Sequence, residues 1–246
     1  MTEEERVGPV RVVAAPLAMA LVMLLVAAVG EWLLLPSHAV HDLDAAVLDR
    51  AYGSLDGRPG LVDAALLWAG LSGPWLVHPV VIVVASTLIG VGVARRRALL
   101  TAVVGLVGSG LAALCKVLVA RPRPEPDDPI TVVAGWSYPS GHATNVALGA
   151  VLLLALLHTA PRRWIRVVGT VLVLLGTGLT GLDRLVLGVH YLSDVLAGYV
   201  LGTAMAVVGL LVLRCTPDRL VAVRSAGAGP GRSSTPRRGR DPRPPR

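Results

Sequence analysis

Three short segments of this chain combine basic side chains with histidines at spacings that suit chemistry on a phosphate group. The first runs from Lys116 to Arg123 and Pro124. Lys116 falls within an apolar stretch, where an ionisable group is costly and by default indicates a functional site. Pro122 and Pro124 force the chain out of a helix, so Arg123 can turn back toward Lys116. We therefore expect two cations side by side at the end of this helix.

The second segment, Pro139-Ser140-Gly141-His142, comes directly before an apolar stretch that predicts a helix. Serine is a favourable residue at a helix N-cap. Free backbone N–H groups at a helix N-terminus also bind anions. The segment therefore predicts an anion-binding helix end with a histidine beside it.

The third segment contains Arg184, His190 and Asp194. Asp194 follows His190 by four residues, a spacing that places two side chains on one face of a helix. A carboxylate in that position can accept the imidazole Nδ1–H and direct Nε2 into a cavity. The spacing thus predicts a histidine whose orientation depends on an aspartate.

Together the three segments supply three cations, a helix N-terminus and two histidines, a set that suits phosphoryl transfer. Cations and amides bind the phosphate oxygens and stabilise the charge of the transition state. One neutral histidine attacks phosphorus in line, and a protonated histidine delivers a proton to the leaving oxygen. We expect no metal and no other cofactor, because three cations already neutralise the phosphate and the sequence offers no carboxylate cluster.

These residues resemble the signature motifs of the type 2 phosphatidic acid phosphatase superfamily, which also includes vanadium-dependent haloperoxidases. The first family motif, Lys-x6-Arg-Pro, matches Lys116, Arg123 and Pro124, and the second matches residues 139–142. The third, Ser-Arg-x5-His-x3-Asp, matches Arg184, His190 and Asp194. Asp183 stands where the family usually has serine. The resemblance covers residues 61–213.

The resemblance implies a role for each matching residue. His190 would be the nucleophile that forms a phosphohistidine, Asp194 would orient it, and His142 would be the general acid. An anion at Asp183 would repel the substrate unless it points away or pairs with an arginine. The residues implied in phosphate binding are Lys116, Arg123, Ser140, Gly141 and Arg184.

The composition predicts that membrane helices position these segments. Hydrophobic residues make up 54% of the chain and charged residues only 16%, against about 25% charged residues in soluble domains. This excludes a disordered chain and disfavours a soluble globule. A bilayer core requires about 20 apolar residues in a helix. We therefore predict an all-α bundle of six transmembrane helices, residues 12–35, 75–94, 98–120, 143–160, 165–182 and 195–213, with short interfacial helices at 42–52 and 61–72.

The basic residues predict the orientation of this bundle. Of 23 Lys and Arg residues, 17 lie in the N-terminus, in the loops after the second and fourth spans, and in the tail. The positive-inside rule places these segments, and both termini, in the cytoplasm. The three motifs then face the extracytoplasmic side of the cell membrane. Membrane topology thus accounts for the net charge of +7, and we expect no nucleic-acid partner.

The predicted organisation has four parts: a cytoplasmic N-terminus (1–11), the first transmembrane helix with an outer amphipathic segment (12–60), a phosphatase core (61–213) and a disordered Arg/Pro-rich cytoplasmic tail (214–246). The predicted function is hydrolysis of a lipid phosphomonoester or diphosphate, of the isoprenyl diphosphate or phosphatidic acid type. Two alternatives are a vanadate-dependent haloperoxidase with the same pocket and a non-catalytic lipid-phosphate binder or transporter. The expected partners are this substrate and membrane lipids, and the sequence indicates no oligomeric state.

Overall fold

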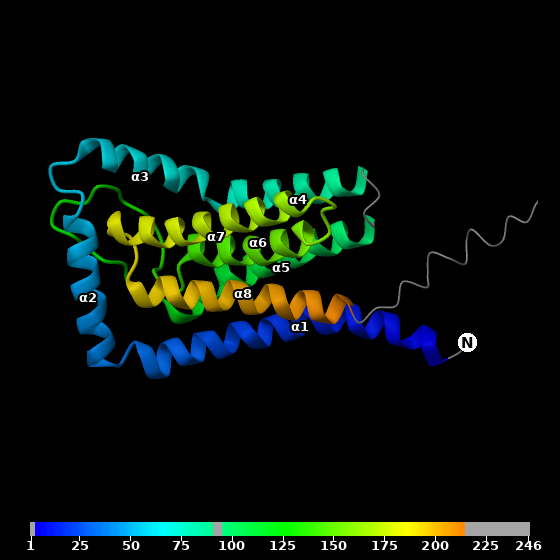
Figure 1. The fold of residues 1–246 in the computed structure, drawn as a ribbon. Helices are drawn as coiled ribbons and strands as arrows, with labels where there is room; N and C mark the ends of the chain where they lie inside the picture. Colours follow the sequence, from blue (N-terminus) through cyan, green and yellow to red (C-terminus); the bar gives the residue numbers. More distant parts are fainter. Residues whose placement is uncertain (1–2, 91–94, 215–246) are drawn as a thin grey trace, which may run out of the picture. The chain divides into compact units, whose positions relative to one another are not determined.

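The computed structural model of the protein describes residues 3–90 and 95–214, and every regular element within them is a helix. This confirms the all-α class for that part of the chain. The end of the second predicted span and the tail from residue 215 lie outside the described residues. In chain order (Figure 1) the helices are α1 (Glu3–Val29), the short π-helical turn η1 (Gly30–Leu34), α2 (His38–Gly53), α3 (Pro59–Leu71), α4 (Pro74–Gly90), α5 (Arg95–Val119), α6 (Gly141–Leu157), α7 (Arg163–Val186) and α8 (Leu192–Arg214).

Four of the described helices are long and apolar enough to cross a membrane: Val13–Leu34, Thr101–Val119, Arg163–Val186 and Leu192–Val212. The pair α3 and α4 counts as a fifth if the two helices form one bent span. Helix α6 is apolar but shorter, with 17 residues. The stretches predicted as spans are thus helical over most of their described residues, with turn or irregular backbone at 35, 120 and 158–160. The count of six crossings stays a prediction.

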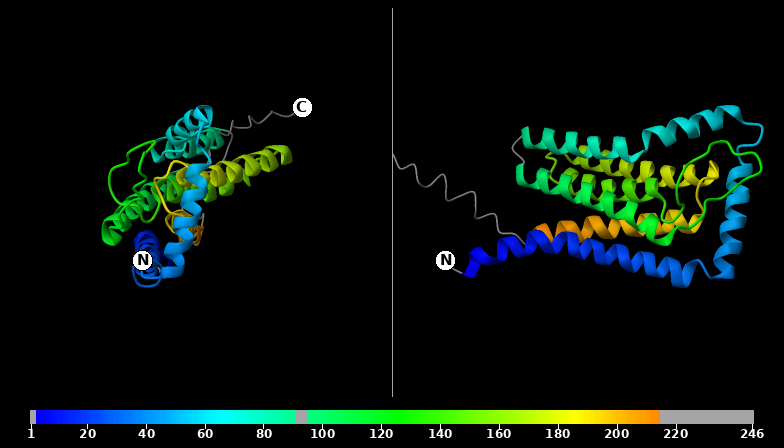
Figure 2. Two further views of the ribbon diagram at one scale, coloured as in Figure 1. Left: turned by 90° about the vertical axis from the view of Figure 1, so that its left-hand side faces the viewer. Right: turned by 180° about the vertical axis from the view of Figure 1, so that it is seen from behind.

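The two short helices predicted to lie at the membrane surface differ in their placement. Helix α2 crosses one end of the bundle, whereas α3 runs beside α7 (Figures 1 and 2). The indole Nε1–H of Trp68 in α3 donates to Thr180 Oγ1 of α7 at 3.1 Å. Pro74 has no N–H with which to continue a helix, and α3 meets α4 at 55°. The placement of residues 61–72 at the membrane interface stays a prediction, and the structure adds that this apolar helix packs against a neighbouring helix.

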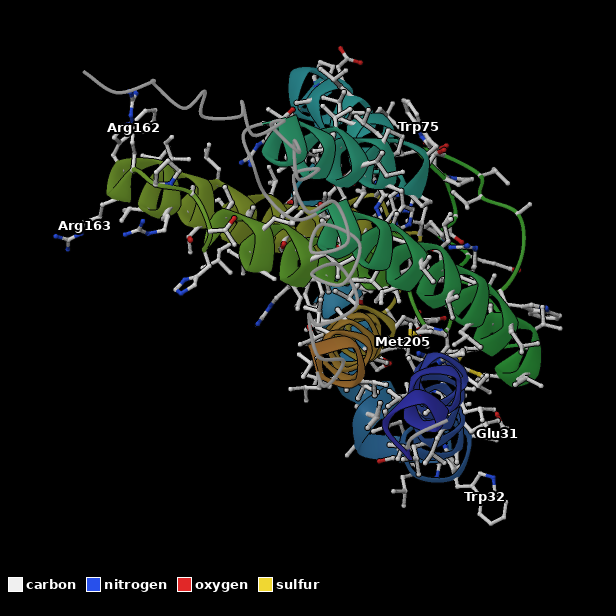
Figure 3. All side chains as sticks on the ribbon, turned by 90° about the vertical axis from the view of Figure 1, so that its right-hand side faces the viewer. Glu31, Trp32, Trp75, Arg162, Arg163 and Met205 are labelled. Carbon is white, nitrogen blue, oxygen red and sulfur yellow. The ribbon has the colours of Figure 1, made fainter. Side chains whose placement is uncertain are left out.

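A hydrophobic core lies among α1, α5, α6 and α8. Met205 of α8 lies in the interior of this helix group in Figure 3. It packs with Met19, Cys115, Leu148 and Leu201, all of which are fully buried. This core holds α5, α6 and α8, which carry Lys116, His142 and Asp194.

Two glycines on α8 allow it to approach the backbone of α6. A Cβ on Gly198 would lie 2.8 Å from the carbonyl oxygen of Ser140, and one on Gly202 would collide with the carbonyl of Thr144. Small residues four positions apart let two membrane helices pack at short distance. As a result, the Ser140 N–H donates to the Asp194 carbonyl oxygen at 2.9 Å. The second and third motifs are thus joined at the starts of α6 and α8.

Arginines gather at the opposite end of the bundle from α2. Arg162 and Arg163 project outward where α7 begins (Figure 3). The guanidinium of Arg166 donates to the carbonyl of Ala160 at 2.7 Å and so caps the end of the preceding segment. The three motif segments instead lie at the end that α2 crosses (Figure 1).

Candidate active site

His190 lies in the turn that connects α7 with α8. Gly188 in this turn has a φ of +65°, and a Cβ there would lie 2.7 Å from the Tyr52 ring, so only glycine fits. The imidazole of His190 is buried, and burial lowers its pKa to about 4 even though Asp194 opposes the shift. His190 is therefore neutral at physiological pH, as a nucleophile must be.

The contacts of His190 identify which of its nitrogens carries the hydrogen. Arg123 Nη1 lies 3.1 Å from His190 Nε2. A guanidinium can only donate hydrogen bonds, so Nε2 accepts and the hydrogen resides on Nδ1. Nδ1 in turn lies 3.2 Å from the hydroxyl oxygen of Ser137. The in-plane lone pair of His190 is thus on Nε2, where it accepts from a cation of the first motif.

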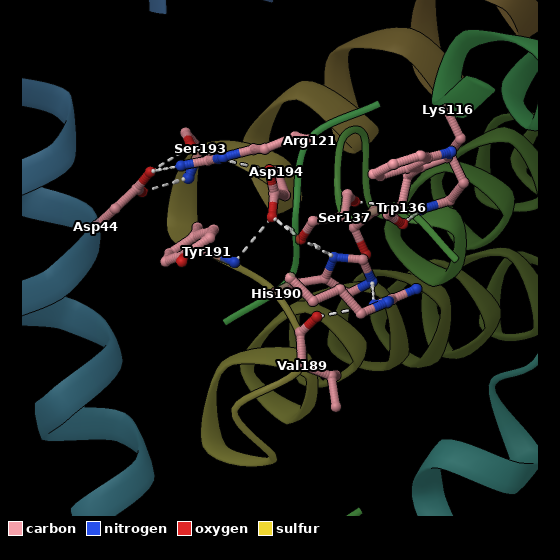
Figure 4. A network of polar contacts seen from close by, with 12 residues as sticks. Asp44, Lys116, Arg121, Trp136, Ser137, Val189, His190, Tyr191, Ser193 and Asp194 are labelled. Atoms are coloured by element: carbon pink, nitrogen blue, oxygen red, sulfur yellow. Dashed lines mark hydrogen bonds and ion pairs between the residues drawn. The ribbon is translucent and has the colours of Figure 1, made fainter. Parts of the chain in front are cut away.

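Ser137 connects His190 with Asp194. The distance from His190 Nδ1 to Asp194 Oδ2 is 3.6 Å, which is too long for a hydrogen bond. The buried Ser137 hydroxyl accepts from Nδ1 and donates to Asp194 Oδ2 at 2.5 Å (Figure 4). The expectation that Asp194 accepts the Nδ1–H directly is therefore corrected, because a hydroxyl lies between them. The only signal in the sequence was the position of Ser137 two residues before the second motif.

Asp194 is also held from its other side, by Arg121. Arg121 Nη1 donates to Asp194 Oδ1 at 2.6 Å, and its Nη2 donates to Asp44 Oδ2 at 2.9 Å. Asp44 and Asp194 are 2% and 0% exposed. Burial alone would lower the pKa of Arg121, but the two aspartates outweigh it and raise the pKa. Arg121 is thus a charged neighbour of the site, and Asp44 brings α2 into the network.

Lys116 lies over the second motif. Its Nζ donates to the carbonyl oxygens of Trp136 at 2.9 Å and Ser137 at 3.2 Å (Figure 4). A Cβ on Gly141 would lie 3.3 Å from Lys116 Cε. A side chain at position 141 would therefore displace the lysine, and its absence lets the cation lie against the start of α6.

Arg123 is held by backbone carbonyls of two other segments. Its Nε donates to the carbonyl of Gly135 at 3.0 Å and its Nη1 to that of Val189 at 2.8 Å. Burial lowers the pKa of Arg123, with Asp194 opposing the shift and the positive charge of Arg184 adding to it. The charge of Arg184 thus lies near enough to act on Arg123, and two neighbouring cations favour an anion close to them.

Ser140 and His142 lie at the start of α6. Ser140 is the N-cap residue, as expected, and its buried hydroxyl oxygen has no hydrogen-bond partner among the described residues. His142 Nε2 lies 3.3 Å from the carbonyl oxygen of Ala69 in α3. A carbonyl can only accept, so this nitrogen carries a hydrogen. Ser140 thus offers a hydroxyl without a partner among the described residues. His142 offers an N–H that donates to the Ala69 carbonyl of α3.

Asp183 pairs with its neighbour Arg184. Arg184 Nε donates to Asp183 Oδ2 at 3.0 Å, and Nη2 donates to the same oxygen. Both side chains are buried, and Asp183 Oδ1 has no partner among the described residues. Of the two arrangements expected for Asp183, in place of the usual serine, the structure has the one in which the aspartate pairs with an arginine.

The network of Figure 4 joins Lys116, Ser137, His190 and Asp194, and His142 and Arg184 make their own contacts with Ala69 and Asp183. Within residues 3–90 and 95–214, no three His, Cys, Asp or Glu side chains are grouped so that they could hold a metal ion. The arrangement offers a buried nucleophilic nitrogen, cations beside it and a second histidine that donates a hydrogen bond. Such a set can bind a tetrahedral anion and exchange one of its substituents.

Comparison with known proteins relates this site to a family. The sequence profile of the PAP2 superfamily matches residues 97–219. Decaprenylphosphoryl-5-phosphoribose phosphatase from Mycobacterium tuberculosis is 32% identical over 176 residues, which are 69% of this chain and 88% of that protein. Undecaprenyl-diphosphatase from Sulfolobus acidocaldarius is 38% identical over 81 residues, which are 33% of this chain and 32% of the relative.

The fold has a counterpart among solved structures. The PAP2-type phosphatidylglycerolphosphate phosphatase from Bacillus subtilis superposes with a TM-score of 0.67 at 24% sequence identity. The match covers 83% of this chain and 98% of that one. The arrangement of helices is thus shared over most of the described residues.

Proposed function

This chain belongs to the PAP2 superfamily, and from that membership we propose that it is a membrane phosphatase that hydrolyses a phosphomonoester or diphosphate on a lipid. The phosphatase class follows from the family and its lipid phosphatase relatives. The substrate type follows from two of their names, since both specify a polyprenyl chain. An isoprenyl phosphate or diphosphate is therefore our first choice and phosphatidic acid our second.

The state of His190 carries this proposal. Its Nε2 carries the lone pair and accepts from Arg123, while Nδ1–H is hydrogen-bonded through Ser137 to Asp194. When Nε2 bonds to phosphorus, the imidazole becomes positively charged. Asp194, acting through the Ser137 hydroxyl, then stabilises that charge. A histidine held in this tautomer is suited to form a phosphohistidine.

The proposed reaction has two steps. In the first, Nε2 of His190 attacks phosphorus, the bond from phosphorus to the leaving oxygen breaks, and the protonated form of His142 gives that oxygen a proton and becomes neutral. In the second, water attacks phosphorus, His142 takes its proton, and the bond to Nε2 breaks. Arg123 leaves Nε2 for a phosphate oxygen when substrate binds. The other phosphate ligands are Lys116, Arg184, Ser140 and the Gly141 amide.

The proposed setting is a six-span bundle with its active site on the extracytoplasmic side and both termini in the cytoplasm. Arg162, Arg163 and Arg166 support this orientation, because they lie at the opposite end of the bundle from the site. The phosphatase core comprises residues 61–213. Residues 12–60 extend the core by supplying α2, whose Asp44 bonds to Arg121.

Phosphate release by the purified protein in detergent tests this function. The panel contains a polyprenyl diphosphate, a polyprenyl monophosphate and phosphatidic acid. We expect turnover that EDTA leaves unchanged and vanadate inhibits, because vanadate resembles the trigonal-bipyramidal transition state. Binding without turnover would instead indicate a lipid-phosphate carrier, and vanadate-dependent halide oxidation would indicate a haloperoxidase.

The general-acid role of His142 predicts an effect that depends on the leaving group. His142→Ala is expected to slow hydrolysis of a lipid phosphomonoester by about 10²–10⁴-fold, because its alkoxide leaves poorly without a proton. Hydrolysis of p-nitrophenyl phosphate should fall far less, since nitrophenolate is a stable anion. Steady-state kinetics with both substrates measure the ratio. Equal losses for the two substrates would contradict proton donation by His142.

A further inference from the structure

We propose that a groove between α4, α6 and α7 binds the hydrocarbon chain of the substrate lipid while the phosphate of that lipid occupies the candidate active site. This inference rests on the proposed function. The groove has a volume of about 260 Å³. Its walls include Val77 and Val80 of α4, Leu153 of α6, and Leu172 and Val173 of α7. Its ligand is therefore an apolar chain.

The few hydroxyl groups in the groove do not make it polar. Thr177 and Thr180 each donate to a carbonyl of their own helix at 2.8 Å. Thr180 also accepts the indole hydrogen of Trp68. The exception is Ser72, whose buried hydroxyl has no partner among the described residues. Ser72 follows Ala69 by about one turn, so the one free polar group lies toward the end nearest His142.

The groove begins along α6 within about one turn of His142, at the end of the helix where the reacting groups lie. The residues of α6 that line it are Val146, Gly149, Ala150 and Leu153. They follow His142 at intervals of four, seven, eight and eleven residues, so they share its helix face. On α7, Thr180 lies in the lining and Arg184 follows it by one turn. A lipid held at both histidines and Arg184 can thus extend its chain between these same two helices.

The other end of the groove opens toward the bilayer. Leu172 is 64% exposed and Val80 is 42% exposed. From Thr180 to Leu172 the groove follows α7 for about 12 Å, at 1.5 Å per residue. A chain of comparable length would be covered by protein, and any further carbon atoms would remain among the membrane lipids.

A second apolar cavity lacks this connection with the site. It lies among α1, α2 and α8 and has a volume of about 400 Å³. Asp44 and Ser193 form its wall on the side of the site, and both are hydrogen-bonded to Arg121. A chain in that cavity would therefore be separated from His190 Nε2 by a buried ion pair.

Two glycines of α7 allow a matched test. A Cβ on Gly176 would lie 3.9 Å from the Trp68 ring, whereas a Cβ on Gly178 meets nothing within 4 Å and Gly178 is exposed. Gly176→Leu therefore fills the groove, and Gly178→Leu makes the same change on the outside of the same helix. Val80→Trp fills the groove from α4.

The readout is kcat/KM for a long-chain lipid phosphate, for a short-chain analogue and for water-soluble p-nitrophenyl phosphate. In the wild type, kcat/KM is expected to rise with chain length until the groove is full. Gly176→Leu and Val80→Trp should lower kcat/KM for the long-chain lipid by about tenfold more than for p-nitrophenyl phosphate. Gly178→Leu should match the wild type for all three substrates.

Two results would overturn the groove assignment. One is that both filling variants retain the wild-type preference for the long chain, and the other is that they lose activity on all three substrates equally. If the proposed function is incorrect, the result is a different one: the wild type itself releases no phosphate from any lipid. The assay therefore distinguishes an incorrect groove from an incorrect function.

Discussion

His190→Ala is expected to lower phosphate release from the lipid substrate by about 10⁴-fold or more, the scale on which loss of a nucleophile acts in hydrolases. The variant lacks the nitrogen that bonds to phosphorus, and no other imidazole is hydrogen-bonded to Ser137 in the described residues. Single-turnover assays with ³²P-labelled substrate measure the effect. They also detect acid-labile phosphate on the wild-type protein, which the variant should not show.

His158→Ala is the matched control for this prediction. His158 is an exposed histidine that follows α6 at the end of the bundle away from the site. Its replacement should leave both turnover and phosphoenzyme formation unchanged. Near-normal turnover by a folded His190→Ala variant would rule out His190 as the nucleophile.

Arg121→Met is expected to have the largest effect on stability, lowering the free energy of unfolding by about 3–5 kcal/mol. Arg121 is the cation that bonds to both Asp44 and Asp194, and all three side chains are buried. Its removal leaves two carboxylates without that partner in a region of low dielectric. Thermal unfolding in detergent should then occur about 10 °C lower. Activity should also fall, because Asp194 loses one of its fixed contacts.

Arg50→Met tests whether this effect is specific to the buried arginine. Arg50 lies in the last turn of α2 and is exposed, so the same substitution there should change the melting temperature little. A similar melting temperature for both variants would show that the Asp44–Arg121–Asp194 network does not stabilise the fold.

The helices and most of the site could be predicted from local patterns. The apolar stretches are long enough to specify helices whatever their neighbours are, and the three motifs supply every cation and histidine of the site. Lys116 illustrates why the site could be predicted. A lysine within an apolar run is costly, and a phosphate site that also includes Arg123 and Gly141 accounts for its presence. Even Asp183 followed one of the two arrangements that its charge allows.

The contacts between segments could not be predicted in the same way. Asp44 is 150 residues from Asp194, and nothing in the pattern of α2 relates them. Ser137 was missed because a spacing of four residues is compatible both with a direct bond from His190 to Asp194 and with an intervening hydroxyl. The break between α3 and α4 is visible in the sequence at Gly73 and Pro74, whereas the packing of α3 beside α7 is not.

Local patterns thus specify which groups are available: the apolar helices, the cations, and the His190 and Asp194 pair. Packing between distant segments selects which of these groups touch. Hydrogen bonds tolerate errors of only a few tenths of an ångström, and the offset between α6 and α8 is set by the close approach at Gly198 and Gly202. That offset brings Ser140 to Asp194. Such contacts depend on packing between distant residues, so local patterns do not contain them.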